Sequence, residues 1–554
     1  MQTEQSEEAN EVENPSEESN EEFNDLHLPE ETMLDSTEGF CIAPGEGQTP
    51  LPIFMDKNCI QLAFPTIWFG HPRGVPPPGI RLSLEDYINS EIRRYDRRCC
   101  RNDYLLCQHK IAQVLQMMKQ ANIVMRKSAQ TNNITASQVM NKEFIDNAVN
   151  SDNAYRFLAS IIGSPPYWEN QKKRALAMVR QLGGFHLFIT LTAAETHWNE
   201  LLVILKKTVD KVDITEEDAS KMEFEEKARL ISEDPVTCSQ YFNHRVRELF
   251  KTWKTKNGPF RNYKILHRYF RIEFQHRGSP HVHLVLWIED APIFNPDDQE
   301  SQRTVIEFVD SIITTDSEDP EVQDVIKYQY HKCTKTCRKR KRGKESCRFN
   351  APFHPMEETT VLEPFPTGYK PSDQMQEKIK KINEKIPTIL DNKDEPVNSF
   401  DDFLTKLECT KEEYFEAIRS KLSHRKIFLK RKPKDARING YNKKILTLMR
   451  SNMDIQYVLD VYSCLTYIVD YINKADRGVS RLLRQCVEDF SRGHNVLRTK
   501  LKAVTNIVYN SSEVSAQEAS WIRCRLPMSE STVVVEFINP SPSKVIMAFT
   551  FYIR

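Results

Sequence analysis

Residues 269–289 read YFRIEFQHRGSPHVHLVLWIE, and this stretch decides the fold that we expect. It predicts two β-strands joined by a short turn at residues 276–280, which contain a glycine and a proline. Side chains alternate between the two faces of a strand. One face of the hairpin would therefore carry apolar side chains for a core, namely Ile272, Phe274, Val282 and Leu284.

The opposite face of this hairpin would be polar. If Gln275 pairs opposite His281, then Glu273 pairs opposite His283, and all four side chains project together. Two imidazoles and a carboxylate are suitable ligands for a divalent cation such as Mg²⁺ or Mn²⁺. A lone histidine on a strand is more often a surface or core residue than a ligand. Here the polar quartet lies opposite an apolar quartet, which favours a metal site.

The neighbouring sequence supplies further strands and helices. The run FHLFITLTA at 185–193 is apolar and β-branched, as in a buried strand, and TVVVEFI near the C-terminus is also strand-like. Residues 215–255 and about 372–422 have helical patterns, and a last amphipathic helix is expected over roughly 454–474. Strands alternating with helices predict an α+β domain with a central sheet flanked by helices.

The charge of the chain is distributed unevenly. Its 554 residues contain 77 Lys and Arg against 78 Asp and Glu, but residues 1–56 hold sixteen of the acidic residues and no Lys or Arg. The remainder carries 77 basic residues against 62 acidic ones, which suits a polyanionic partner such as nucleic acid. Residues 1 to about 39 are rich in Glu, Asn and Ser, and they predict a disordered acidic tail.

A basic segment at residues 328–355 is rich in cysteine and histidine. It contains three thiols and two imidazoles, those of His331, Cys333, Cys337, Cys347 and His354. Three thiolates and one imidazole would form a tetrahedral zinc site, for which we select His331 with the three cysteines, although the spacing is not a standard C-x-x-C pair. Five consecutive basic residues follow Cys337, and they would contact DNA phosphates or act as a nuclear localisation signal: Arg338, Lys339, Arg340, Lys341 and Arg342.

Four tyrosines fall in the last predicted helix. Tyr467, Tyr471 and Lys474 are spaced at i, i+4 and i+7, so they share one helical face. Tyrosines at this spacing often only pack a core, and we assign that structural role to Tyr457 and Tyr462. A phenol is a weak nucleophile until its anion is stabilised, and a nearby lysine and metal would provide that help.

These motifs together resemble a known family. His281-Val282-His283 is similar to the His-hydrophobic-His motif of HUH endonucleases, and EFQHRGSPHVHLVLWIEDAP resembles the replication-initiator domain of Helitron transposases. The run FITLTA at 188–193 is similar to the first motif of these enzymes, and the resemblance extends over about residues 40–540. It implies an HUH-type antiparallel sheet and a third ligand on the neighbouring strand, with Glu273 preferred to Gln275.

The resemblance also implies an activity. The two nucleophilic tyrosines of Helitron proteins correspond to Tyr467 and Tyr471. A tyrosine would attack single-stranded DNA at transposon ends and targets, giving a 5'-phosphotyrosine and a free 3'-hydroxyl, with Mg²⁺ or Mn²⁺ at the site. Helitron proteins have a similar Cys/His knuckle, which supports structural Zn²⁺ in the basic segment. The alternative is a catalytically silent, truncated remnant that only binds DNA.

The expected organisation follows from these features. The segments are a disordered acidic tail (1–39), an N-terminal helical and extended module (40–150), the first part of the nuclease core (151–310), a Cys/His-rich basic DNA-binding segment (311–365), a helical insertion (366–440), the tyrosine-helix region that completes the nuclease (441–500) and a linker toward a missing helicase (501–554).

Some function classes are not supported by the sequence. It contains no G-x-x-x-x-G-K-[ST] phosphate loop, so we expect no ATP site in this chain and a helicase supplied by another chain. It lacks an apolar run of roughly 18 residues and a signal stretch, so we expect no membrane partner. Thirteen cysteines without a signal peptide are better explained as reduced thiols or metal ligands than as disulfides, and we expect a nuclear protein.

Overall fold

The structure is a computed structural model, and it divides the chain into two compact units, Met1–Val75 and Pro76–Arg554. It describes residues 58–74, 78–131, 157–260, 262–274, 278–334, 337–341, 344–392, 394–470, 513–538 and 548–552. The described part of the first unit holds two short helices, α1 (Cys59–Ala63) and α2 (Pro65–Trp68). All other elements belong to the second unit.

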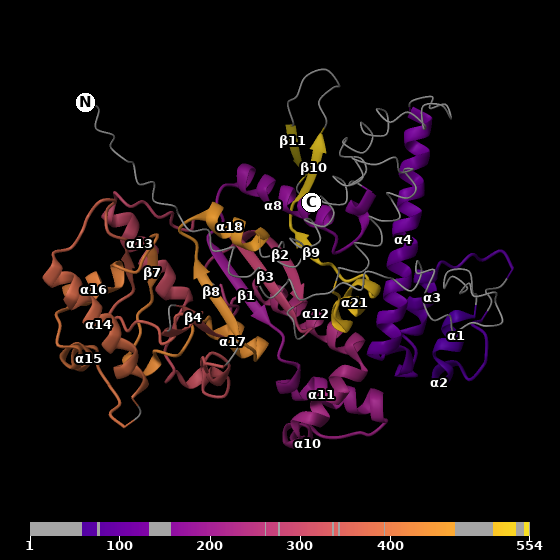
Figure 1. Cartoon of the computed structure of the whole chain (residues 1–554), viewed down its shortest axis with the longest axis horizontal. Coiled ribbons are helices and arrows are strands. Elements are labelled where there is room, and N and C mark those ends of the chain that lie inside the picture. Colours follow the sequence, from indigo (N-terminus) through magenta and orange to yellow (C-terminus); the bar gives the residue numbers. More distant parts are fainter. Residues whose placement is uncertain are drawn as a thin grey trace, which may run out of the picture. The chain divides into compact units, whose positions relative to one another are not determined.

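A five-stranded antiparallel sheet forms the centre of the second unit (Figure 1). The strand order is β8-β1-β3-β2-β9. The strands are β1 (Leu187–Thr192), β2 (Ile265–Phe274), β3 (Pro280–Ile288), β8 (Met453–Tyr457) and β9 (Ser529–Ser531). The structure thus confirms the α+β prediction with a central antiparallel sheet. Its three inner strands come from residues 187–288, and both edge strands come from much later in the chain.

Helices flank this sheet and extend away from it. They are α3 (Leu84–Glu91), α4 (Asn102–Thr131), α8 (Pro165–Leu182), α9 (Asn199–Leu205), α10 (Glu216–Lys221), α11 (Phe224–Glu233), α12 (Pro235–Thr252), α13 (Gln299–Ile312), α17 (Lys443–Met449), α18 (Val461–Asp470) and α21 (Ala516–Arg523). Helix α3 begins at a capping box formed by Ser83 and Asp86. No helix among the described residues is both long and apolar enough to cross a membrane.

One face of the sheet is apolar and packs on α12. Ile272, Val282 and Leu284 are all buried, as the alternation in the hairpin predicts. On α12, Phe250 lies with its ring 5.6 Å from that of Phe270 on β2. Burial of these side chains is the main source of stability for the sheet, at about 25 cal/mol per Å² of apolar surface.

Two parts of the helical prediction are wrong in detail. The helix expected over 454–474 begins instead with strand β8, and only α18 is helical in its described part. Met453 and Ile455 alternate with polar neighbours and are buried against β1, so the strand period applies there rather than the helical one. The helix expected over 215–255 is divided into α10, α11 and α12, with Pro235 at the first position of α12.

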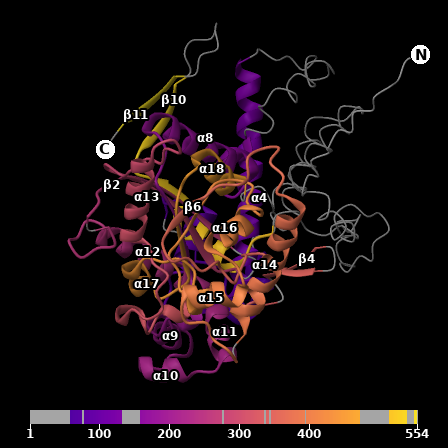
Figure 2. The same cartoon turned by 90° about the vertical axis from the view of Figure 1, so that its left-hand side faces the viewer.

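A second hydrophobic core lies in the helical region after the basic segment. Helices α14 (Asp373–Asp391), α15 (Phe400–Leu407) and α16 (Lys411–Arg419) pack together around buried Phe403 and Tyr414 (Figure 2). A two-stranded sheet of β6 (Thr360–Leu362) and β7 (Lys426–Phe428) completes it. Two further small sheets are β4 (Arg338–Lys341) with β5 (Lys344–Cys347), and β10 (Val534–Ile538) with β11 (Ala548–Tyr552).

Candidate functional site

The second face of the central sheet carries the polar residues of the hairpin, but in a different register from the one expected. Glu273 pairs with His281, and Arg271 pairs with His283. The prediction that Glu273 lies opposite His283 is therefore wrong by two residues. Because the shift is even, Glu273 and both histidines still project from the same face. The segment between the strands lies one residue earlier in the chain than expected, since β2 ends at Phe274 and β3 already begins at Pro280.

Direct contacts connect these side chains. The Nε2 atom of His283 lies 2.6 Å from Oε2 of Glu273, a diagonal contact between β3 and β2. The Nδ1 atom of His281 lies 2.9 Å from Oγ1 of Thr192 on β1. The two imidazole rings are 4.7 Å apart between centroids. The hairpin and β1 thus bring two imidazoles and one carboxylate into one small region.

Burial controls the ionisation of this region. It lowers the pKa of His281 to about 3, helped by the neighbouring His283. His283 is itself 4% exposed and stacks on the ring of Phe188, with the planes at 10° and the centroids 5.9 Å apart. An imidazole that stays neutral offers a lone pair to a cation, so His281 is in the form that a metal requires at neutral pH.

The same face holds residues that the sequence reasoning missed. The guanidinium of Arg271 lies 4.2 Å from the ring centroid of Trp168 on α8. At the β8 edge of the sheet, Asp454 pairs with Thr190, which itself pairs with His283, so Asp454 projects from the same face, and burial raises the pKa of its carboxyl. Apolar and polar residues alternate with a period of two within MDIQY, and this strand pattern could have placed Asp454 on the polar face. Arg271 could have been found from its position two residues before Glu273 on the same strand.

The donor set of this face fits a divalent cation in its chemistry, and Glu273, His281 and His283 would supply the ligands. They are held less tightly together than a complete metal site. Among the described residues, a group of His and Cys ligand atoms that lie within 4.8 Å of one another occurs in the basic segment. The hairpin residues Glu273, His281 and His283 do not form such a group. Gln275, the second-choice third ligand, lies outside the described residues.

The predicted nucleophile helix is described only in part. Tyr467 belongs to α18, whereas its side chain, Tyr471 and Lys474 lie outside the described residues. Helix α18 follows β8 directly, and Leu465 on it is buried in the main core. Tyr457 is on β8 and donates a hydrogen bond of 2.6 Å to the carbonyl of Pro292, and Tyr462 is exposed.

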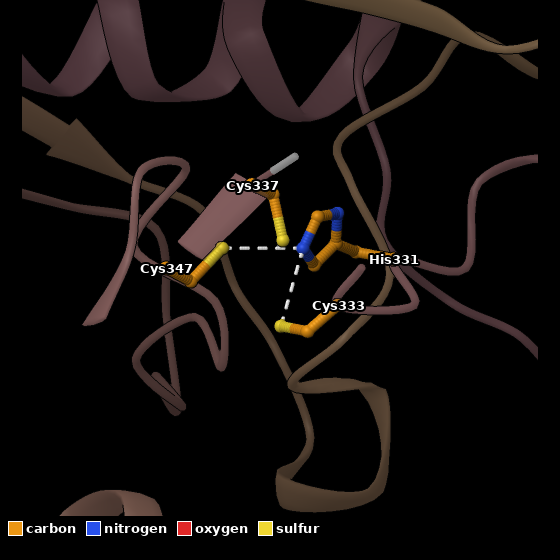
Figure 3. Close-up of side chains that lie close together, drawn as sticks. All are labelled: His331, Cys333, Cys337 and Cys347. Carbon is orange, nitrogen blue, oxygen red and sulfur yellow. Dashed lines mark hydrogen bonds between the residues drawn. The ribbon is translucent and has the colours of Figure 1, made fainter. Parts of the chain in front are cut away.

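The Cys/His cluster is compact. His331, Cys333, Cys337 and Cys347 place one ligand atom each within 4.8 Å of one another (Figure 3). The Nε2 atom of His331 lies 3.2 Å from the sulfur of Cys347 and 3.5 Å from that of Cys333. Figure 3 shows all four side chains pointing toward one common centre. Three thiols and one imidazole are a tetrahedral zinc ligand set. His354, the second histidine of the segment, packs instead against the rings of Tyr414 and Phe428.

Backbone and arginine contacts prepare this cluster for a cation. Burial acts to raise the pKa of the Cys337 thiol, but hydrogen bonds, led by one from the backbone amide of Thr334, bring it below its usual value. Burial, with the nearby Arg437, lowers the pKa of His331 and keeps its imidazole neutral. Arg437 also lies 3.7 Å from the sulfur of Cys333 and pairs with Asp391 of α14 at 2.6 Å. The cluster is thereby tied to the helical region.

The basic residues lie on the hairpin that the cluster supports. Strand β4 carries residues 338–341 and pairs with β5, so that Arg338 faces Cys347. Arg338 and Lys339 are exposed, whereas Arg342 lies outside the described residues. The side chains of Arg340 and Lys341 lie outside the described residues as well, and exposed basic side chains such as those of Arg338 and Lys339 are suitable contacts for phosphates.

One comparison with known proteins identifies part of the chain. Residues 91–286 match the family model described as a Helitron helicase-like domain at the N-terminus. The matched region ends within β3, so it includes β1, β2 and both histidines. No curated protein matches the chain.

Proposed function

Starting from the relation of this chain to Helitron transposases, we propose that it is an HUH-type nuclease that nicks single-stranded DNA and transfers the strand. The observation that carries the proposal is the polar sheet face, where Glu273, His281 and His283 project together from two paired strands. Mg²⁺ or Mn²⁺ bound there would polarise the phosphate that is attacked.

The position of α18 supports a tyrosine nucleophile. Helix α8 packs on the polar face, because its Trp168 stacks on Arg271 of β2. Helix α18 contacts α8. The helix that carries Tyr467 therefore lies on the same side of the sheet as the two histidines, while α12 covers the other side. Tyr471 and Lys474 follow Tyr467 at helical spacing in the sequence.

The reaction needs no external energy source. The phenol oxygen of Tyr467 or Tyr471 attacks the phosphorus in line and loses its proton. The bond from phosphorus to the 3'-oxygen breaks, and that oxygen takes up a proton to become a free 3'-hydroxyl. The DNA remains attached as a 5'-phosphotyrosine, which keeps the energy of the broken bond for rejoining. A second tyrosine would allow one site to process donor and target strands in turn.

The basic segment would serve DNA binding. We propose that His331, Cys333, Cys337 and Cys347 hold a structural Zn²⁺, which would fix the β4–β5 hairpin. The hairpin residues 338–342 would then contact the DNA backbone. DNA as the partner agrees with the excess of basic over acidic residues beyond residue 56, and the same basic run would direct the protein to the nucleus.

The decisive experiment is a search for a covalent adduct. Purified protein is incubated with labelled single-stranded DNA and Mn²⁺ or Mg²⁺, and denaturing gels show whether label remains on the protein. The wild type is expected to form the adduct, and the Tyr467→Phe/Tyr471→Phe double variant is not. Tyr462→Phe is the matched control, because Tyr462 is an exposed tyrosine of the same helix.

The second candidate function is a silent remnant that only binds DNA. The compact Cys/His cluster favours retained binding, and the direct contact between Glu273 and His283 is compatible with a site that is no longer used. A wild-type protein that binds DNA and forms no adduct would establish this alternative. Cleavage that persists in the double variant would refute the tyrosine assignment.

A further inference from the structure

A partly polar cavity lies beside the candidate nuclease face. It has a volume of about 370 Å³ and is formed by α4, α8, α21 and the segment that leads into β9. Its walls include five aliphatic side chains, those of Ile161, Ile162, Ile522, Leu526 and Met528. Cavities of roughly 300–1,000 Å³ with apolar walls and a few polar groups are typical of small-molecule and nucleotide sites.

Three polar side chains of this cavity are buried and have atoms without a hydrogen-bonding partner. Among the described residues, His109 is 2% exposed and neither ring nitrogen has a hydrogen-bonding partner. The same is true of Oε1 of Gln113, which is 8% exposed, and of Nε of Arg523, which is 6% exposed. A buried polar atom without a partner costs about 1–3 kcal/mol. Three such side chains around one cavity indicate a ligand that satisfies them.

The charge of the cavity distinguishes between ligands. The Arg523 guanidinium pairs with Glu85 at 3.2 Å, and Arg525, which also lines the cavity, pairs with Glu85 at 3.5 Å and with Asp86 at 3.7 Å, so both positive charges already have carboxylate partners. Burial, with the nearby Arg523, lowers the pKa of His109 to about 3, so the ring is neutral and offers one donor and one acceptor. Gln113 offers an amide oxygen. These groups complement the edge of a neutral heterocycle, and the aliphatic walls complement its flat faces.

The cavity lies close to the sheet face at which DNA is proposed to bind. Ser529 lines the cavity and pairs with Arg271 on β2, which in turn pairs with His283 on β3. His283 and Ser529 are therefore two strand spacings apart, a distance of about 10 Å. A single strand held at the polar sheet face would bring a base near the nicked phosphate within reach of the cavity.

We propose that this cavity binds one unstacked nucleobase of the single-stranded DNA substrate, with His109 and Gln113 reading its edge. The inference rests on the proposed nuclease function and adds to it a place where the DNA sequence is read. Enzymes that act on DNA commonly hold an unstacked base by hydrogen bonds to its edge and by contact with apolar side chains. Base recognition here would set which nucleotide lies next to the cleaved bond.

Binding measurements with single-stranded oligonucleotides test the proposal. An abasic site is moved through one oligonucleotide position by position, and affinity is followed by fluorescence anisotropy without added Mg²⁺ or Mn²⁺. One position is expected to weaken wild-type binding about tenfold, the size of a lost base contact. His109→Leu and Gln113→Leu should bind the intact oligonucleotide more weakly and should no longer distinguish the abasic one. His244→Leu, at an exposed histidine of α12, should behave as the wild type.

Thermal unfolding distinguishes a role of His109 in recognising a base from a structural role of this residue. The nitrogens of His109 make no hydrogen bond that His109→Leu would remove, so this variant should unfold at the same temperature as the wild type or above it. A marked loss of stability would make His109 a structural residue and would overturn the proposal. Full competition by free deoxynucleoside monophosphates, or by inorganic phosphate, would instead identify a small-molecule site and would also overturn it.

The outcomes differ from those that test the nuclease. A wild type that forms the covalent adduct but is equally sensitive to an abasic site at every position refutes the base pocket alone. A wild type that shows the single sensitive position but forms no adduct refutes the nuclease and leaves base recognition standing.

Discussion

Glu273 and His283 contact each other through a carboxylate oxygen and an imidazole nitrogen 2.6 Å apart, although the ladder pairs Glu273 with His281. The contact is diagonal, and it leaves His281 to interact with Thr192 on the other side. One carboxylate thus lies within reach of two imidazoles that belong to the same strand. This arrangement makes Glu273 the residue on which the proposed metal site depends most.

Replacing Glu273 should therefore remove metal-dependent cleavage while the fold is retained. Glu273→Gln keeps a hydrogen-bonding group beside His283 but removes the charge that balances a divalent cation. We expect Mn²⁺ affinity, measured by calorimetry, to fall by at least about tenfold and adduct formation to fall with it. His244→Gln serves as the control at an exposed site. Unchanged Mn²⁺ binding by Glu273→Gln would exclude this residue as a ligand.

The Cys/His cluster should bind zinc independently of the nuclease face. Cys337→Ser removes a thiol whose pKa is lowered by its hydrogen bonds, and we expect elemental analysis of the purified variant to show less than one zinc per chain. Its thermal unfolding should shift to lower temperature. Cys409→Ser is a suitable control, because Cys409 packs against the second core and lies outside the cluster. Equal zinc content in the wild type and Cys337→Ser would contradict the assignment.

The start of the tyrosine helix packs against Gly184, a glycine in the loop between α8 and β1. A Cβ atom on Gly184 would lie 2.6 Å from Cγ2 of Val461, the first residue of α18. Gly184→Ala should therefore displace α18 and cost about 1–3 kcal/mol of unfolding free energy. We expect slower adduct formation as well, because the displaced helix carries Tyr467.

A second substitution tests whether the effect of Gly184→Ala arises from its contact with Val461. Val461→Ala removes the methyl groups that the new side chain would meet, so Gly184→Ala/Val461→Ala should recover much of the stability and activity lost in Gly184→Ala. If the double variant is no better than Gly184→Ala alone, the close approach of these two residues does not determine the position of the helix.

Acid should destabilise the protein partly through His354. Burial lowers the pKa of this imidazole to about 3, far below its value in an unfolded chain. Between about pH 6.5 and pH 3 the unfolded chain therefore binds one more proton than the folded protein, and stability falls as the pH falls, by about 1.4 kcal/mol per pH unit. In denaturant titrations, the unfolding free energy of His354→Leu should depend less on pH than that of the wild type. The unfolding free energy of His244→Leu should depend on pH as that of the wild type does. Equal slopes for all three proteins would show that His354 is not buried neutral.

The hairpin and its core face could be predicted from the sequence because alternation is a local property of the chain. Ile272 and Val282 are buried as expected, and Glu273 shares a face with both histidines. The register itself could not be predicted, since a shift of two residues preserves every facing preference. The position of the turn along the chain decides it, and part of that turn lies outside the described residues.

The edge strands illustrate what the sequence could not supply. Met453–Tyr457 was included in a helix, because five residues before a strongly helical segment give too short a pattern to separate the two periods. Pairing with β1, more than 250 residues earlier, makes it a strand. The polar cavity was also not predicted, because His109 and Gln113 become significant only when α21 and the start of β9 close over them.

The distant origin of β9 has a consequence for how the protein is made. Among the described residues, the outer side of β2 is hydrogen-bonded to residues 528–532, which leave the ribosome more than 250 residues after β2 itself. During synthesis the nascent chain must carry an unpaired strand edge, and such edges are sites of aggregation. Translation that stops shortly before residue 529 would leave the whole histidine hairpin of β2 and β3 assembled but with its edge open, and chaperone demand should be greatest at that stage.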